Sequence, residues 1–309
     1  MVGARVLLFD STQVGLSGFF EIMTTPITTP IFARPAVCGG ARLGYTVSAD
    51  GGSTRLLEQW VRPPLHMTKA YHDQGWAISQ LMSPTAGLLQ DDVLEVDVRV
   101  GDGARAAIIS PAACRVHTMT TGYATVRQTY TVGAGAALDV WPAPLILQKD
   151  AALRQETRLE VDPTATALIC ELISPGRAAF GECFEFKEWR SSLRIYRGGR
   201  LLSLENFSAQ PARGDLVDWR ETYSNGSYAG IYYLSPEPLD ALIQGIHDLE
   251  CEGAIIGASP LREGGLGLKL IAQDGISLRH AIFAVRQLLI AHSKVSFPSA
   301  LTRAQTFFH

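Results

Sequence analysis

The feature that most constrains the fold is a strand–turn–strand pattern that recurs about every thirty residues. Each copy has a strand ending in valine, a tight turn rich in Gly, Asp or Pro, and then alanine and a second strand. The copies are VRVGDGARAAI (98–108), YTVGAGAALDV (130–140) and LEVDPTATALI (159–169). Recurrence at a near-constant period predicts stacked β-layers, as in a solenoid. The alternative is that glycine-rich hairpins resemble one another by chance, because tight turns need the positive φ that glycine permits.

Short segments rich in Val, Ile, Leu, Thr and Tyr alternate with turn residues from Ala41 to about Ser235. This pattern predicts a mainly β fold. We expect stacked antiparallel β-hairpins in a large solenoid-like or sandwich-like assembly, because a parallel α/β sheet would need helical crossovers. A fourth hairpin, LRIYRGGRLLSL, is expected to turn on Gly198 and Gly199.

Two helices are predicted near the C-terminus, over 236–253 and 275–293, with one strand, GLGLKLIAQ, between them. Ser277 is the predicted N-cap of the second helix. The Thr- and Pro-rich residues 1–40 are interpreted as an irregular N-terminal extension. Residues 41–309 are interpreted as a single β-rich domain that includes both helices.

Composition excludes several classes of protein. Hydrophobic residues make up 47% and charged residues 18%, which supports a sizeable core. The net charge of −3 provides no basic field for nucleic acid. No apolar run reaches the roughly 18 residues of a membrane span. Five widely spaced cysteines without a CxxC pair indicate a reducing compartment, so the cytoplasm is expected.

Motifs for chemistry are mostly missing. The sequence contains no GxxxxGK[ST] loop, no GxSxG elbow and no HExxH, and its seven histidines are scattered. A closed zinc site of four N or S ligands cannot be assembled. We therefore expect no catalytic residues and no tightly bound cofactor.

One polar cluster stands out, in the segment CELISPGRAAFGECFEFKEWR (170–190). Carboxylates within a β-rich core must be paired or face water. One interpretation is a structural network in which Arg177 pins a turn. The other is a polar lining of an internal cavity or channel, in which Glu171, Arg177 and Glu182 lie close together and at least one carboxylate faces a water-filled passage.

The segment PGRAAFGECFEF within this cluster resembles the GRxxxGExF signature of the urease accessory proteins called UreD, or UreH in some organisms. Three further segments resemble the family in the same order, at 66–117, 138–157 and 195–202. The resemblance covers about residues 42 to 293. Departures occur where the family has glycine pairs or polar residues: Ala86-Gly87, Asp91-Asp92, Arg115 with His117, and Pro142-Ala143-Pro144, which lacks an acidic residue.

The resemblance implies a β-rich protein with two helices and without enzymatic activity. It implies binding to apo-urease and to a UreF-type protein, which recruits a UreG-type GTPase. It also implies an internal tunnel for nickel in transit, and weak, scattered ligands suit transit. The metal ligands themselves are not identified. The candidate tunnel or polar-lining residues are Glu171, Arg177, Glu182, Glu185, Asp92 and Ser110.

Two alternatives stay open. One is a β-rich carbohydrate-active enzyme that uses Glu171 and Glu182 as an acid/base pair. The other is a purely structural subunit.

Overall fold

The computed structural model describes residues 37–142 and 144–303. Most of the predicted N-terminal extension therefore lies outside the described residues, as does Ala143. The first strand begins at Cys38, so residues 38–40 are regular rather than irregular as predicted. The compact unit that contains this strand extends from residue 36 onwards.

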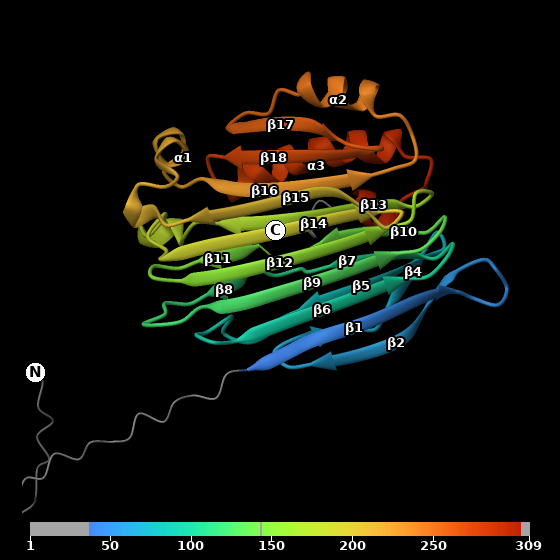
Figure 1. The fold of residues 1–309 in the computed structure, drawn as a ribbon, viewed down its shortest axis with the longest axis horizontal. Helices are drawn as coiled ribbons and strands as arrows, with labels where there is room; N and C mark the ends of the chain where they lie inside the picture. Colours follow the sequence, from blue (N-terminus) through green and yellow to red (C-terminus); the bar gives the residue numbers. More distant parts are fainter. Residues whose placement is uncertain (1–36, 143, 304–309) are drawn as a thin grey trace, which may run out of the picture. The chain divides into compact units, whose positions relative to one another are not determined.

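Two large β-sheets dominate the described part of the chain (Figure 1). The first sheet has the strand order β15 (Arg200–Ala209), β14 (Glu188–Arg197), β12 (Ala152–Val161), β9 (Ala124–Val132), β6 (Val93–Val100), β1 (Cys38–Val47) and β2 (Thr54–Arg62). The second has the order β17 (Ala254–Leu261), β18 (Gly265–Ala272), β16 (Ser227–Leu234), β13 (Thr166–Ser174), β10 (Ala137–Trp141), β7 (Arg105–Ile109), β5 (Trp76–Met82) and β3 (His66–Met67), with β4 (Tyr71–Asp73), β8 (Cys114–Val116) and β11 (Leu145–Leu147) beside it.

The recurring pattern forms successive layers of a β-solenoid-like stack, as predicted. Each layer places one strand in the first sheet, makes a tight turn, and places the next strand in the second sheet. The valines that precede the three turns lie in register: Val132 pairs with Val100 on one side and with Val161 on the other. Adjacent turns are also joined, because Gly133 N–H donates to the Val100 carbonyl at 2.8 Å.

The direction of pairing in the stack differs from the predicted antiparallel hairpins. Strands β6, β9, β12 and β14 pair in parallel, as do β5, β7, β10 and β13. The turns pass the chain to the opposite sheet, so consecutive strands face each other across the core without hydrogen bonding. The opposite strand thus serves as the crossover that a parallel pair requires. The Gly198–Gly199 turn does make the predicted hairpin, between β14 and β15.

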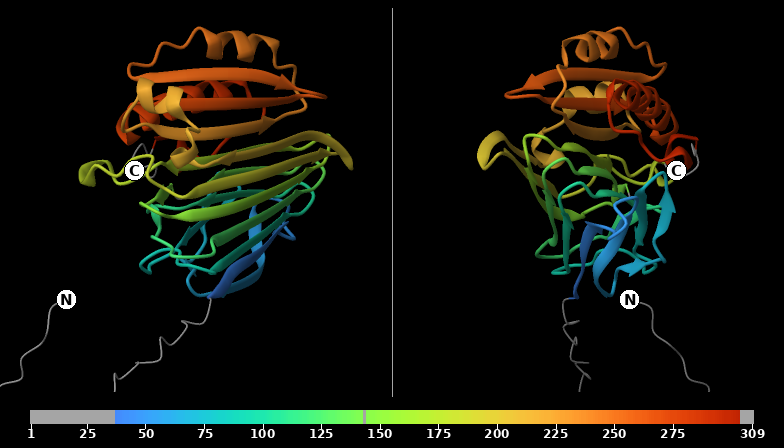
Figure 2. Two further views of the ribbon diagram at one scale, coloured as in Figure 1. Left: turned by 60° about the vertical axis from the view of Figure 1, so that its left-hand side comes forward. Right: turned by 90° about the vertical axis from the view of Figure 1, so that its right-hand side faces the viewer.

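The main hydrophobic core lies between the two sheets, which Figure 2 shows as two layers. Strand β6 contributes every second residue to it: Leu94, Val96, Val98 and Val100. A second core covers the other face of the second sheet. Because this sheet is buried on both faces, β10 is buried at all five positions.

Helices and a C-terminal segment cover that second face. Within the described residues the α-helices are α1 (Val217–Thr222), α2 (Asp240–His247), α3 (Gly275–His292) and α4 (Ser299–Arg303), with short 3-10 turns at Ala178–Phe180 and Pro211–Arg213. Both predicted helices are present as α2 and α3. The predicted cap of α3 is wrong by three residues: Asp274 is the N-cap, and its side chain accepts from Ser277 N–H at 2.8 Å.

A sealed ion pair joins α3 to the stack. Arg286 of α3 is 1% exposed and binds both carboxylate oxygens of Asp139 in β10, at 2.9 and 2.5 Å. The indole N–H of Trp141 donates to the same carboxylate. The Arg286 guanidinium also lies over the rings of Trp141 and Phe297. This network holds the helix on the sheet, and nothing in the local sequence predicted it.

Candidate functional site

The signature-like segment forms the loop between β13 and β14. Arg177 donates from Nη2 to Glu182 Oε2 at 2.9 Å and from Nε to Oε1 of the same carboxylate. The guanidinium also lies over the ring of Phe180, 4.4 Å from its centroid. The hydrogen bonds from Arg177 hold the pKa of the Glu182 carboxyl below its usual range. This bidentate pair closes the loop, as the structural interpretation of Arg177 expected.

The loop also supports neighbouring elements. A Cβ at Gly176 would lie 2.2 Å from the Glu182 carbonyl oxygen, so only glycine fits this close approach. Phe184 packs edge-on against Trp219 of α1, with ring centroids 5.0 Å apart. The segment therefore positions α1 relative to β13 and β14.

The expected grouping of Glu171 with Arg177 and Glu182 is not found. Strand β13 ends at Ser174, so Arg177 and Glu182 leave the sheet with the loop. Glu171 stays within the strand and faces the space between the sheets, in a cavity that neither of the other two lines. The structure thus separates a loop-closing ion pair from a buried carboxyl that faces a cavity.

The other three predicted residues have structural contacts of their own. Glu185 pairs with Lys149 at 2.8 Å on the surface. Asp92 is buried and accepts from Val37 N–H at 3.0 Å and Leu89 N–H at 2.9 Å, and Ser110 donates to the Leu81 carbonyl at 2.5 Å. None of Glu185, Asp92 and Ser110 lines the cavity that contains Glu171.

Two positions of the family's glycine pattern, one replaced and one kept, fit the backbone. Asp91, which stands where the family has glycine, has a φ of 64°, in the left-handed region that favours glycine and tolerates aspartate. Gly87 keeps its glycine, and a Cβ there would lie 2.2 Å from the Arg115 carbonyl oxygen. The local backbone therefore retains the conformation that the family's glycines favour.

The cavity beside Glu171 has a volume of about 560 Å³ and lies between the last two strands of the first sheet and the facing strands of the second. Strands β14 and β15 form one wall, and β13, β16 and β18 form the other. Aromatic residues line one part of it, where Trp189 packs against Phe207 and Tyr228 with centroids 4.6 and 5.5 Å away. Its lining residues are Glu171, Trp189, Ser191, Leu193, Leu204, Glu205, Asn206, Phe207, Leu216, Trp219, Tyr228, Tyr232, Lys269 and Ile271.

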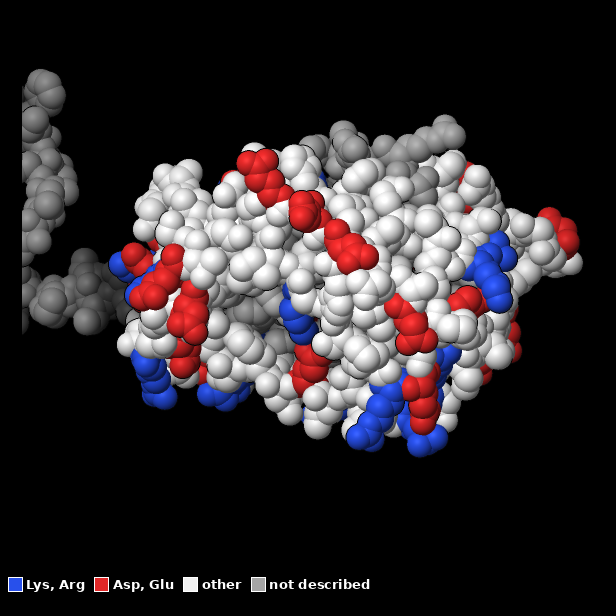
Figure 3. All heavy atoms as spheres, turned by 90° about the horizontal axis from the view of Figure 1, so that it is seen from above, with Lys and Arg blue, Asp and Glu red and all other residues white. Residues whose placement is uncertain are grey.

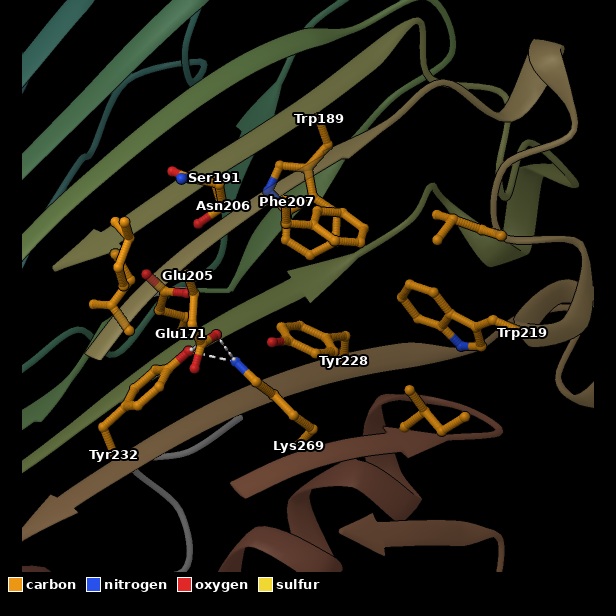
Figure 4. Close-up of a pocket in the computed structure, with 14 residues that line it drawn as sticks. Glu171, Trp189, Ser191, Glu205, Asn206, Phe207, Trp219, Tyr228, Tyr232 and Lys269 are labelled. Carbon is orange, nitrogen blue, oxygen red and sulfur yellow. Dashed lines mark hydrogen bonds and ion pairs between the residues drawn. The ribbon is translucent and has the colours of Figure 1, made fainter. Parts of the chain in front are cut away.

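Polar side chains converge at the other part of the cavity (Figure 4). Lys269 Nζ lies 2.6 Å from Glu205 Oε2 and also donates to the Tyr232 hydroxyl. That hydroxyl donates to the same Glu205 oxygen at 2.7 Å. Glu171 lies beside this group and accepts from Thr157 Oγ1 at 2.9 Å. We call Glu171, Glu205, Tyr232 and Lys269 the cavity cluster.

Burial raises the pKa of two members of the cavity cluster, Glu171 and Tyr232. Desolvation raises the pKa of the Glu171 carboxyl, while the hydrogen bond from Thr157 and the charge of Lys269 act in the opposite direction. Desolvation also raises the pKa of the Tyr232 hydroxyl, and the negative charge of Glu171 adds to this shift. Tyr232 is therefore a neutral phenol at physiological pH.

Sequence reasoning missed three of the four members of the cavity cluster. Lys269 carried the available signal, since it is the lone charge in the apolar strand GLGLKLIA. Glu205 and Tyr232 carried none, because Glu205 sits in a strand of mixed polar and apolar residues and Tyr232 in a strand that is buried at nearly every position. Among the described residues, no group of three or more His, Cys, Asp or Glu side chains is arranged to hold a metal ion. Nor is any described helix long and apolar enough to cross a membrane.

Comparison with known proteins agrees with the fold and the motifs. The family described as UreD urease accessory protein matches residues 38–304. This chain belongs to the UreD family. It is 35% identical to the urease accessory protein UreD of Opitutus terrae over 246 residues, which cover 77% of this chain and 89% of that relative. It is 28% identical to the UreD of Actinobacillus pleuropneumoniae over 255 residues, 79% of this chain and 94% of that relative.

A third relative carries the family's other name. The urease accessory protein UreH of Helicobacter hepaticus is 32% identical over 162 residues, 52% of this chain and 64% of that protein. The resemblance found in the signature segment is thus confirmed over most of the chain. This UreD-family protein is a urease accessory protein.

Proposed function

We propose that this protein is a non-catalytic maturation scaffold that binds apo-urease together with a UreF-type protein, and through it a UreG-type GTPase, and conducts nickel toward the urease active site. Membership of the UreD family over residues 38–304 is the observation that carries the proposal. Nickel is cargo here, so no resident cofactor is invoked. Five free cysteines fit a reducing compartment, and we place the protein in the cytoplasm.

The cavity supports a passage for cations. Its polar part presents the carboxyl groups of Glu171 and Glu205, which are oxygen ligands, without a closed set of three or more acidic, His or Cys ligands among the described residues. An ion in transit must find ligands and leave them again, so a partial set suits passage better than a tight site. Glu171 is therefore the predicted residue that we retain for this role.

The surface supports partner binding. Seen from the end of the stack that carries α2 and β17, most of the surface is uncharged (Figure 3). Strand β17 is an edge strand with Ile255 half exposed, and the edge strand β15 exposes Leu201 and Leu204. Uncovered edges with apolar side chains are typical of surfaces that another chain covers.

The carbohydrate-active alternative has little geometric support. It needs Glu171 and Glu182 to flank one bond, yet Glu182 is held by Arg177 outside the cavity that Glu171 lines. The purely structural alternative differs from the proposal only in nickel delivery, so an experiment on nickel decides between them.

The test expresses urease and its other accessory proteins in a host without a UreD gene, with this chain or its variants supplied. We expect the wild-type chain to restore urease activity. We expect Glu171→Ala to co-purify with urease and the UreF-type protein but to yield nickel-poor urease, measured by elemental analysis. Glu185→Ala is the matched control, since it removes a surface carboxylate from the signature segment and should leave nickel loading unchanged.

Three results would contradict the proposal in different ways. If the wild-type chain restores no activity, it is not a urease maturation factor for the urease tested. If Glu171→Ala yields fully nickel-loaded urease, this carboxylate is not part of the passage. If Glu182→Ala assembles but lowers nickel loading while Glu171→Ala does not, the loop-closing pair was misjudged as structural.

A further inference from the structure

Lys269 places a positive charge inside the cavity where a metal ion would bind. It extends from β18, and its ammonium contacts Glu205 Oε2 and the Tyr232 hydroxyl. Its side chain is 44% exposed, so it is anchored in the wall but can reach open solvent. A lysine on a flexible four-carbon stem can leave such a contact without any movement of the backbone.

Glu171 presents an unused ligand to this ammonium. The residue is 5% exposed, and its Oε1 accepts from Thr157. Within residues 37–142 and 144–303, no hydrogen bond to its Oε2 is formed. The positive charge of Lys269 lowers the pKa of the Glu171 carboxyl, and the negative charge of Glu205 raises it. Glu171 and Glu205 therefore line the same cavity as this one ammonium, which contacts Glu205 directly.

We infer that Lys269 is a tethered cation that occupies the Glu171–Glu205 site, and that a divalent metal ion must displace its ammonium to enter. This inference rests on the proposed passage of cations through the cavity. A divalent ion next to the ammonium is repelled, and this repulsion keeps its affinity low. When the ammonium swings away, the ion meets both carboxylates; when the ammonium returns, the ion is released. Lys269 thus makes the site transient.

The chemistry predicts what happens without the ammonium. Removing one positive charge leaves Glu205 without its cation and gives a metal ion two carboxylates, with Tyr232 as a neutral oxygen ligand. Such oxygen sets bind divalent first-row metals in the order of their intrinsic affinities, so nickel should bind more tightly than manganese. The wild-type chain should bind both weakly.

The experiment measures Ni²⁺ binding to the full-length chain by equilibrium dialysis at fixed pH and salt. We expect Lys269→Met to tighten the binding of one Ni²⁺ ion at least about tenfold, because the repulsion is removed. Lys269→Arg keeps the charge and should bind like wild type. Lys149→Met is the matched control, since it removes a lysine from an exposed 2.8 Å pair with Glu185. It should leave the Ni²⁺ affinity unchanged, and any Ni²⁺ binding by the scattered histidines is the same in every variant.

A second substitution ties the gain to the site. Adding Glu171→Gln to Lys269→Met should return the affinity to within about threefold of wild type, since one carboxylate is lost. Circular dichroism verifies folding, and Lys269→Gln replaces Lys269→Met if the latter does not fold. The inference would be overturned if Lys269→Met and Lys269→Gln bound Ni²⁺ no more tightly than wild type. A gain in Ni²⁺ affinity that persists when Glu171→Gln is added, or that also appears in Lys149→Met, would overturn it too.

Urease activation by the same variants separates this inference from the proposed function. If the wild-type chain fails to activate urease, the proposed function fails whatever the affinities are. If the wild-type chain activates urease but Lys269→Met binds Ni²⁺ no more tightly, only the role of Lys269 is wrong. If both hold, Lys269→Met should retain nickel and slow urease activation at limiting nickel.

Discussion

Two charged pairs of this protein differ in how fully they are enclosed. Arg286 and Asp139 are 1% and 0% exposed and pair with each other through two hydrogen bonds. Lys269 and Glu205 also pair, but their side chains are 44% and 34% exposed beside an open cavity. The first pair lies between a helix and a sheet, and the second joins strands of the two sheets beside the cavity.

The degree of enclosure decides what each pair can do. A sealed pair cannot exchange partners without unfolding, because either charge alone in the core is strongly unfavourable. A pair beside a cavity can exchange one cation for another, because water and space are at hand. The same chemistry, a carboxylate with a basic side chain, is structural in one place and suited to transit in the other.

The largest expected effect comes from breaking the sealed pair. Asp139→Ala should lower the free energy of unfolding by about 3–5 kcal/mol, because Arg286 is left charged in the core. Urea denaturation followed by circular dichroism measures the loss. Asp139→Leu combined with Arg286→Met should recover most of it. If Asp139→Ala costs less than the corresponding change at Glu205, the contrast between the two pairs is wrong.

The next effect concerns the loop that supports the cavity wall. Gly176→Ala should destabilise the protein by about 1–3 kcal/mol, because the new methyl group overlaps the Glu182 carbonyl. Gly181→Ala is a control in the same loop: its Cβ meets open space, although its φ of 68° still disfavours alanine. Thermal unfolding should rank Gly176→Ala below Gly181→Ala, and the reverse order would argue against the close approach.

A smaller, pH-dependent effect comes from Glu171. Its pKa is raised in the folded protein, so the folded state holds the proton more tightly than the unfolded state. The resulting stabilisation is complete below the ordinary carboxyl pKa of about 4 and is lost as pH rises through the raised value. Glu171→Gln keeps a neutral side chain, so its melting temperature should match wild type at low pH and exceed it near pH 7. Parallel pH profiles would show that Glu171 is not desolvated.

A partner that covers the exposed strand edges should change the soluble yield of the protein rather than its free energy of unfolding. The edges at β15 and β17 carry exposed apolar side chains, which favour aggregation when no partner covers them. We expect low soluble yield of the chain alone and a higher yield on co-expression with a UreF-type protein, measured by gel filtration. A concentrated, monodisperse monomer without any partner would count against this.

The smallest expected effect is none at all. The cavity has the size of a ligand pocket, but its carboxylates would repel phosphates, and the sequence has no phosphate-binding loop. Isothermal titration with GTP and magnesium should give no heat of binding. Micromolar affinity for GTP would mean that the cavity serves a nucleotide, and the division of roles with a separate GTPase would fail.

Much of the fold was predictable because the pattern is repetitive. Val100, Val132 and Val161 mark the same position of successive layers, and they do pair in register. The two helices and the strand between them were also predicted from apolar periodicity. Pairing direction was not, because a turn that forms a hairpin and a turn that crosses to the opposite sheet use the same Gly, Asp and Pro residues.

The candidate site was predicted only in part. Of the six proposed polar residues, Glu171 lines the cavity, and Arg177 and Glu182 form the loop-closing pair that the structural interpretation expected. Their separation depends on where β13 ends, a boundary that sequence places poorly. A charged residue in an apolar strand, Lys269, was visible, but its partner Glu205 could not be inferred.

The β-rich stack, its period and its family follow from the amino-acid sequence alone. The alternation of apolar residues and the turn residues are local patterns, formed by neighbouring residues within one layer of the stack. Tertiary packing sets which strands pair, where the cavity forms between the sheets and which charges meet. Those outcomes depend on contacts between segments far apart in the chain, such as β10 with α3 and β15 with β18. The contrast between a sealed ion pair and one beside a cavity therefore exists only in the folded protein.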